Sequence, residues 1–207
     1  MDWVKYDLKL FLHETSKVAL EEFIPVFHRW IQTQCLDDLL IDVADYRHVH
    51  HGPGVVLVAH DAHYAMDMAE GKLGLLYSRR RETHASRSAM QNAEERLTSV
   101  FRCALTACQR LEAESAWYGR LRFRGDVFLL CGNDRLLAPN TPEAYADLQP
   151  CLTSVLRKLY PDGDVEVQQD AQPVSRLTVH IRAAADADVT TLLTRLESNG
   201  SMQGVTS

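Results

Sequence analysis

The sequence predicts an α+β fold, a mainly antiparallel sheet with helix-plus-hairpin units packed on one face. Segments with strand-like patterns come in pairs separated by turn residues, which is typical of hairpins. A helical segment precedes each pair, and there is no persistent strand-helix-strand alternation of the kind that builds a doubly wound parallel sheet. Of the 207 residues, 46% are hydrophobic, which is enough for one packed core. We therefore expect a single α+β domain over residues 1–197 and a flexible tail over residues 198–207.

The first half of the chain is expected to hold a strand, a helix and further strands. From Val4 to Leu12 apolar and polar residues alternate, which predicts a half-buried strand. From Glu22 to Cys35 the apolar residues repeat at helical spacing, and Pro25 suits the first turn, where no amide donor is needed. Short apolar segments then predict strands over residues 39–49, 55–59 and 74–79.

The second half is expected to repeat the order of a helix and paired strands. Residues 87–114 carry apolar side chains on one helical face and predict a long amphipathic helix. The segments 120–124 and 127–131 flank Gly125-Asp126 and predict a hairpin. Asn140-Thr141-Pro142-Glu143 is typical of a helix start, with a capping side chain and an early proline. A last pair of strands is expected over residues 165–169 and 176–182.

Histidines are concentrated in one stretch, from Tyr46 to Tyr64, around the turn Gly52-Pro53-Gly54. Antiparallel pairing of the two flanking strands would place some of these imidazoles on one sheet face, and the length of the loop decides which. The hairpin 46–64 is therefore the main candidate site. Its histidines are His48, His50, His51, His60 and His63, out of nine in the chain.

Two registers of this hairpin give two hypotheses about the site. With a loop of four residues, His51 to Gly54, Asp45 lies opposite His60, and its carboxylate would orient that imidazole for acid-base catalysis. With a loop one residue longer, Ala44 lies opposite His60, and His48 shares a face with His60. Imidazoles gathered in this way suit zinc, nickel or copper. The catalytic candidates are therefore His60 and Asp45, and the candidate metal ligands are His48, His50, His60 and His63, with Asp61 as a further ligand.

Arginines form the second feature of interest. Arg120, Arg122 and Arg124 alternate along a predicted strand, so that one face could receive a carboxylate or a phosphate, or pair with a cross-strand acid such as Glu166. The same alternation is also typical of a solvated edge strand that discourages aggregation. Both interpretations are open.

Composition argues against several classes of protein. The formal charge of -6 disfavours nucleic acid as a partner, in spite of the run Arg79, Arg80, Arg81 and Arg87. No apolar segment approaches the roughly 20 residues that span a bilayer, and no secretory signal is recognised, so we expect a cytoplasmic location without membrane contact. Five scattered cysteines indicate free thiols. The motifs of common nucleotide enzymes, zincins and serine hydrolases are absent.

Three segments carry a resemblance to a known family. They are PVFHRWIQ at residues 25–32, LLIDVADYRHV and then GPGVVLV within residues 39–58, and NDRLLAPNTPE at residues 133–143. Together they resemble a family of uncharacterised bacterial proteins, over most of the chain up to Arg182. That family has no established activity. The resemblance therefore implies a bacterial cytoplasmic origin and a single domain, and it transfers no catalytic residue.

The leading functional hypothesis is an accessory binding module without an assigned reaction, whose His-rich hairpin contacts a small ligand, a metal such as zinc, or a protein partner. One alternative is a small cytosolic enzyme that uses His60 and Asp45 in acid-base chemistry. Another is a structural or interaction subunit that forms a homo-oligomer through the hairpin, with Tyr46, Val56 and Val58 buried between chains.

Overall fold

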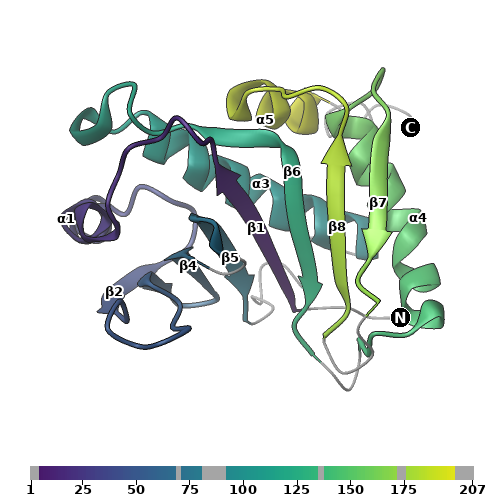
Figure 1. Ribbon diagram of the computed structural model, residues 1–207, viewed down its shortest axis with the longest axis horizontal. Helices are drawn as coiled ribbons and strands as arrows, with labels where there is room; N and C mark the ends of the chain where they lie inside the picture. The colour runs from purple at the N-terminus through teal and green to yellow at the C-terminus, as the bar shows by residue number, and fades with distance from the viewer. Residues whose placement is uncertain (1–4, 69–70, 81–91, 135–137, 172–175, 199–207) are drawn as a thin grey trace, which may run out of the picture.

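A computed structural model describes residues 5–68, 71–80, 92–134, 138–171 and 176–198. Within these ranges it defines eight strands and four α-helices (Figure 1). The expected tail from residue 199 on lies outside the described residues, as do Arg81 and Arg87. The helices are α1 (Phe23–Thr33), α3 (Ala93–Glu112), α4 (Pro142–Leu159) and α5 (Val189–Ser198). The strands are β1 (Tyr6–Leu12), β2 (Leu40–Asp45), β3 (Val55–Ala59), β4 (Ala62–Asp67), β5 (Gly74–Arg79), β6 (Phe123–Gly132), β7 (Val165–Gln169) and β8 (Thr178–Ala183).

The eight described strands form one sheet in the order β2-β3-β4-β5-β1-β6-β8-β7, and all neighbouring strands are antiparallel. The predicted α+β fold with a mainly antiparallel sheet is confirmed. β1 lies inside the sheet, where it pairs with β5 on one side and with β6 on the other. Because β1 joins the strands of the first half of the chain to those of the second half, one sheet runs through all of the described segments.

The four described helices pack against the same face of the sheet, as predicted. On β1, Tyr6, Leu8 and Leu10 point to this face and are buried, as strand alternation requires. In Figure 1, α3 crosses behind β1, while α1 lies against β2 and β3 at one end of the sheet. The buried side chains of the helices and of this sheet face form one continuous core. We call the opposite face, on which none of these helices packs, the open face.

Two helix starts follow from local capping. α4 begins at Pro142, after Thr141, whose hydroxyl accepts a hydrogen bond from an amide of the first turn. This confirms the helix start predicted there. α3 begins at Ala93, later than the predicted Arg87. The reason is that Asn92 has an extended backbone, and its side chain accepts a hydrogen bond from an amide of the first turn.

Three predictions of secondary structure are corrected. Residues 62–67 form the strand β4, which their alanines and polar residues do not indicate. The predicted hairpin over residues 120–131 is wrong, because β6 runs through Gly125 without a turn. Gly125 is required for close packing instead, since an added Cβ would lie 1.8 Å from the carbonyl oxygen of Ala187. The helix α5 follows β8, where no element was predicted.

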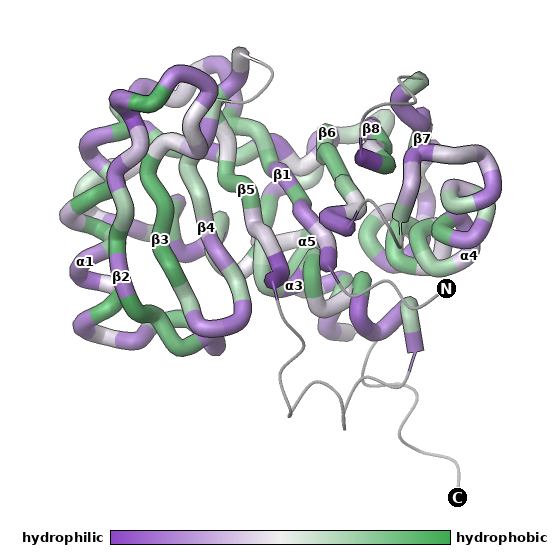
Figure 2. Tube along the Cα trace, turned by 90° about the horizontal axis from the view of Figure 1, so that it is seen from below, coloured by the Kyte–Doolittle hydropathy of each residue, from purple (hydrophilic) through white to green (hydrophobic). Residues whose placement is uncertain are grey.

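The strand β3 is hydrophobic along its whole length, because both of its faces are buried (Figure 2). Val55 and Leu57 face the helices, and Val56 on the open face is only 5% exposed. β3 lies between β2 and β4. The sequence analysis predicted an oligomer interface of Tyr46, Val56 and Val58. Val56 cannot contribute to such an interface, because its side chain is already buried within the chain.

Candidate functional site

The His-rich hairpin adopts neither of the two predicted registers. Asp45 pairs with Val55, so that residues 46–54 form a loop longer than either prediction assumed. The predicted position of Asp45 opposite His60 is wrong, since these residues lie at opposite ends of the β2–β3 ladder. Asp45 instead accepts hydrogen bonds from Arg47 at 2.9 and 2.8 Å, which lower the pKa of Asp45 to about 2. The structure therefore does not assemble a dyad of Asp45 and His60.

The loop is long because residues 46–54 fold into two consecutive turns. The amide of Val49 donates to the carbonyl of Tyr46, and the amide of Gly52 donates to the carbonyl of Val49, each at 2.9 Å. The amide of Tyr46 then closes the loop on the carbonyl of Gly54 at 2.7 Å. An added Cβ on Gly52 would lie 2.9 Å from the carbonyl oxygen of Tyr46, so glycine is needed there.

The four predicted metal ligands divide into two pairs. His48 and His50 are exposed in the loop, whereas His60 and His63 lie at the other end of β3. The length of β3 separates the pairs by roughly 16 Å, so the geometry does not bring all four to one ion. His60 Nδ1 lies 3.0 Å from the carboxylate of Asp61. Across the described segments, no group of three or more His, Cys, Asp or Glu side chains is arranged to hold a metal. Zinc or another transition metal at one of the pairs stays a prediction.

His63 lies on the open face in a row with Ser78 and Asp7 on neighbouring strands. Burial lowers the pKa of His63. The carboxylate of Asp7 is held by Arg176 at 2.7 Å and by the side-chain amide of Asn133 at 2.9 Å. Serine, histidine and aspartate are the residue types of a nucleophilic triad. Here, however, the carboxylate of Asp7 is already bound by Arg176, and this contact ties β1 to the segment before β8.

The loop 46–54 does form one wall of a hollow, which we call the hairpin hollow. Its volume is about 840 Å³. Arg47 on its rim is neutralised by Asp45 and Glu21. The hollow therefore suits an apolar group better than a charged ligand. Its apolar lining residues are Leu20, Tyr46, Val49, Pro53 and Met68.

A second hollow lies on the open face over the neighbouring strands β5, β1, β6 and β8, and its volume is about 430 Å³. We call it the basic hollow. Phe11 and Val127 form part of its apolar lining, and Glu14 lies on its rim. The basic side chains that line it are His13, Lys72, Arg124, His180 and Arg182.

Strand pairing brings these side chains together from distant parts of the sequence. Lys72 precedes β5, whose first residue pairs with Phe11 of β1. On the other side, Val127 of β6 pairs with Arg182 of β8. His180 lies two residues before Arg182 and therefore shares the open face with it. The order across the hollow is a cation, an aromatic ring, an aliphatic side chain and a second cation.

The charges of the basic hollow are only partly neutralised by the protein. Arg124 donates two hydrogen bonds to Asp126, at 2.8 and 2.6 Å, and these lower the pKa of Asp126. In contrast, Lys72 and Arg182 are exposed and have no ion-pair partner among the described residues. His180 is also exposed. Unpaired cations in a concave site attract anions, because the surrounding low-dielectric protein focuses their field.

A buried ion pair supports the lining of the basic hollow. Lys9 Nζ lies 2.5 Å from the carboxylate of Asp67, 2.9 Å from the carbonyl oxygen of Lys72 and 5.2 Å from the centroid of the Phe11 ring. Gly74 makes room for the Lys9 side chain to cross β5, because a Cβ there would lie 3.0 Å from Lys9 Cε. Lys9 therefore connects the backbone of Lys72 to the ring of Phe11, and both Lys72 and Phe11 line the hollow.

A polar network inside the core was missed by the sequence analysis. The hydroxyl of Tyr64 donates to Asp38, whose pKa is raised by burial. Arg79 donates to the hydroxyls of Tyr77 at 3.2 Å and of Ser99 at 2.8 Å. These hydrogen bonds tie β4 to the segment before β2, and β5 to α3. The sequence holds one indication of it, since Tyr77 and Arg79 occupy alternate positions of a predicted strand.

The three arginines predicted to form an anion-binding ladder each have a separate acidic partner. Only Arg124 among them lines the basic hollow. Glu166, the acid suggested as their partner, lies opposite Arg182 instead. The pairs are Arg120 with Glu22, Arg122 with Asp186 and Arg124 with Asp126.

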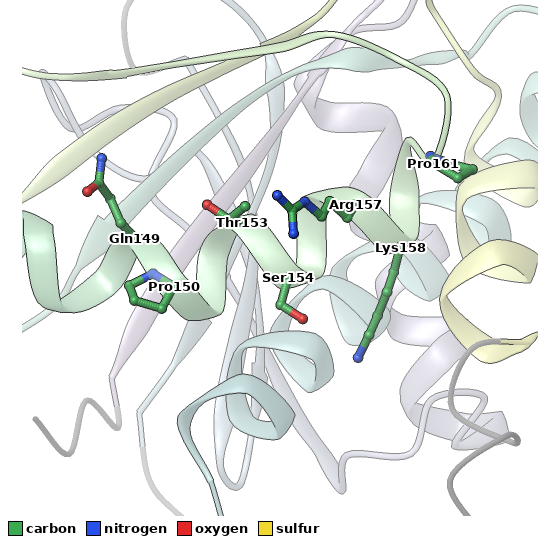
Figure 3. A pocket seen from close by; sticks show the side chains of 7 residues that line it. All are labelled: Gln149, Pro150, Thr153, Ser154, Arg157, Lys158 and Pro161. Carbon is green, nitrogen blue, oxygen red and sulfur yellow. The ribbon is translucent and has the colours of Figure 1, made fainter.

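Another hollow runs along the exposed side of α4 (Figure 3). Its lining residues come from one helix and the turn after it, so side chains do not converge on it from several elements. Lys158 donates to Glu94 at 2.6 Å, while Arg157 is exposed. The basic hollow is therefore the better candidate site, and Arg157 provides a reference cation far from it.

Comparison with protein-family models, with curated proteins and with solved structures gives no match for this chain. In the described part of the chain, no helix is long and apolar enough to cross a membrane. The geometry of the hollows is therefore the basis for a functional proposal.

Proposed function

We propose that this protein is a binding module that takes up a small organic anion in the basic hollow, with no reaction assigned. The observation that carries the proposal is the convergence of Lys72 and Arg182, neither of which has an ion-pair partner in the described segments, on an apolar lining that includes Phe11 and Val127. Small-molecule sites typically combine an apolar lining with a few polar groups, in volumes of about 300–1,000 Å³. The volume of about 430 Å³ lies in that range.

The charge of the whole chain supports the proposal. The formal net charge is -6, so a group of cations in one hollow is not a consequence of a generally basic surface. An acidic protein repels small anions at long range, and binding must then come from local contacts. In the basic hollow the lining groups that can make these contacts are two guanidinium groups, an ammonium and two imidazoles.

The proposal is tested by an NMR titration of the full chain with benzoate, with sodium chloride at equal ionic strength as the blank. We expect amide shifts at residues 11–16, 72–73, 124–127 and 180–182. The variant Arg182→Gln is expected to weaken binding roughly tenfold, because a charge-assisted hydrogen bond is lost. Arg157→Gln changes the net charge equally on the exposed side of α4 and should have no effect. Shifts confined to other surfaces would contradict the proposal.

The hairpin hollow favours a second candidate function, that of an interaction subunit that self-associates through the loop 46–54. Tyr46, Val49 and Met68 are large apolar side chains that are exposed beside one another at this hollow. Such exposed apolar surfaces mark interaction sites. Sedimentation velocity over a range of concentrations should then show a dimer, and Met68→Glu should abolish it. A wild-type monomer at the highest concentration would remove this candidate.

A further inference from the structure

We infer that the ligand of the basic hollow carries two anionic groups, one at each end of an apolar centre, as an aromatic dicarboxylate does. This inference rests on the proposed function and adds the class of ligand to it. Its basis is the position of the two cations that have no ion-pair partner among the described residues. Lys72 lies before β5 and Arg182 lies on β8, on opposite sides of the hollow.

The strand order gives the distance between these two cations. Going from β5 to β8 crosses β1 and β6. These three steps between neighbouring strands place the two backbones roughly 14 Å apart. One anionic group would touch both cations only if both long side chains extended fully toward each other. Two anionic groups, one near each cation, can pair with both Lys72 and Arg182 without full extension of either side chain.

The middle of the hollow suits an apolar centre rather than a third polar group. Phe11 and Val127 occupy the two strands between the cations, and both line the hollow. The ring of Phe11 is contacted by Lys9, whose Nζ lies over it at 5.2 Å from the ring centroid. A flat ring stacked on this lining keeps its two charged ends near Lys72 and Arg182, and aromatic stacking adds to the binding.

The end of the hollow at β8 argues against a compact dianion such as a phosphomonoester. A phosphate is best held by several cations or by the amides at a helix N-terminus. Arg124 is the other guanidinium that lines the hollow, and it is already engaged by Asp126. One carboxylate, held by Arg182 beside His180, is the better fit.

Calorimetry with three ligands that share one aromatic ring tests the inference. The ligands are benzoate, terephthalate and phenyl phosphate, titrated into the full chain at constant ionic strength. Terephthalate has its charges at opposite ends, whereas phenyl phosphate has both at one end. We expect terephthalate to bind roughly tenfold more tightly than either of the others, because it gains a second charge-assisted contact.

Variants separate this inference from the proposed function. Lys72→Gln should reduce the affinity for terephthalate to that for benzoate and leave benzoate unchanged, since a single carboxylate binds at the Arg182 end. Arg157→Gln should change neither. Equal affinities of benzoate and terephthalate, or tighter binding of phenyl phosphate, would overturn the two-ended ligand while the anion-binding function stands. No binding of any of the three ligands would overturn the function itself.

Discussion

Lys9 and Asp67 form a deeply buried ion pair on the open face, with exposed fractions of 1% and 4%. Removing one partner leaves the other charge buried without compensation, which costs about 3–5 kcal/mol. We predict that Lys9→Met lowers the free energy of unfolding by this amount in urea denaturation. The double variant Lys9→Met/Asp67→Leu should recover most of the loss, because apolar side chains of similar size replace both charges.

The ion pair of Lys5 with Asp134 provides the matched control at the end of the same strand. Its charged atoms are 3.7 Å apart, and Lys5 is exposed. Exposed pairs contribute about 0–1 kcal/mol, so Lys5→Met should change the free energy of unfolding by less than about 1 kcal/mol. Equal losses for Lys5→Met and Lys9→Met would show that the burial of Lys9 has no energetic role.

Asp38 gives a prediction about the dependence of stability on pH. Burial raises its pKa, although the hydrogen bond from Tyr64 and the charge of Arg79 act in the opposite direction. Its contribution to stability is therefore fully present below the unfolded-state pKa of about 3.9, and it is lost as the pH rises through the raised folded-state pKa. Asp38→Asn keeps an acceptor for Tyr64 and removes the charge. The advantage of this variant over the wild type, measured by urea denaturation, should grow with pH, and a constant difference would contradict the prediction.

Among the elements, the contact of β6 with the segment that leads into α5 depends on Gly125. An added Cβ there would lie 1.8 Å from the carbonyl oxygen of Ala187, and the amide of Gly125 donates to Asp186 at 2.9 Å. Gly125→Ala should therefore lower the free energy of unfolding by about 1–3 kcal/mol, because the two segments must separate. Gly163→Ala is the control, since its Cβ would make an ordinary contact of 3.5 Å with Tyr160. Equal effects of the two variants in thermal denaturation would refute the role of Gly125.

Elements with strong periodicity or clear caps were predictable from the sequence, whereas those that depend on tertiary contacts were not. The helix that begins after Thr141 and the strand that ends at Leu12 were both predicted and are confirmed. The prediction that this strand is half-buried is wrong, because Asp7 and Lys9 on its polar side are buried as well. β4 has few β-branched residues, and its extended form comes from pairing with β3 and β5 on both sides. In the sequence, a glycine at position 125 can indicate either a turn or a close approach of two backbones. The contact with Ala187, which the sequence does not reveal, shows that the second interpretation holds.

In the whole molecule, the basic hollow shows why a site can escape sequence analysis. Lys72, Phe11, Val127 and Arg182 lie on or next to four neighbouring strands, and local patterns along the chain do not specify that β1 lies between β5 and β6. The histidines illustrate the opposite error. Their closeness in sequence suggested one site, but β3 lies between the two pairs. Of the three alternating arginines that the sequence analysis singled out, only Arg124 lines the hollow.

The continuous core also predicts how the whole molecule unfolds. Both halves of the chain contribute to one core, and the pairing of β1 with β6 joins them. We predict a single cooperative transition in urea. Trp30 and Trp117 are buried and pack on Phe27 and Phe23 of α1, so their fluorescence reports on that end of the core, while far-UV circular dichroism reports on all helices.

A Trp3→Phe variant removes the third tryptophan, which lies outside the described residues, and makes the two probes comparable. Coincident midpoints are expected if residues 1–197 form one domain, because the α1 end and the α4–α5 end then lose their packing together. A fluorescence midpoint at lower urea would place a boundary between the two halves of the sheet.

The basic hollow spans from β5 to β8 and so takes lining residues from both halves of the sheet. Terephthalate should therefore raise both midpoints equally if the sheet unfolds as one unit, because binding to the folded state stabilises every element that must be folded for the hollow to exist.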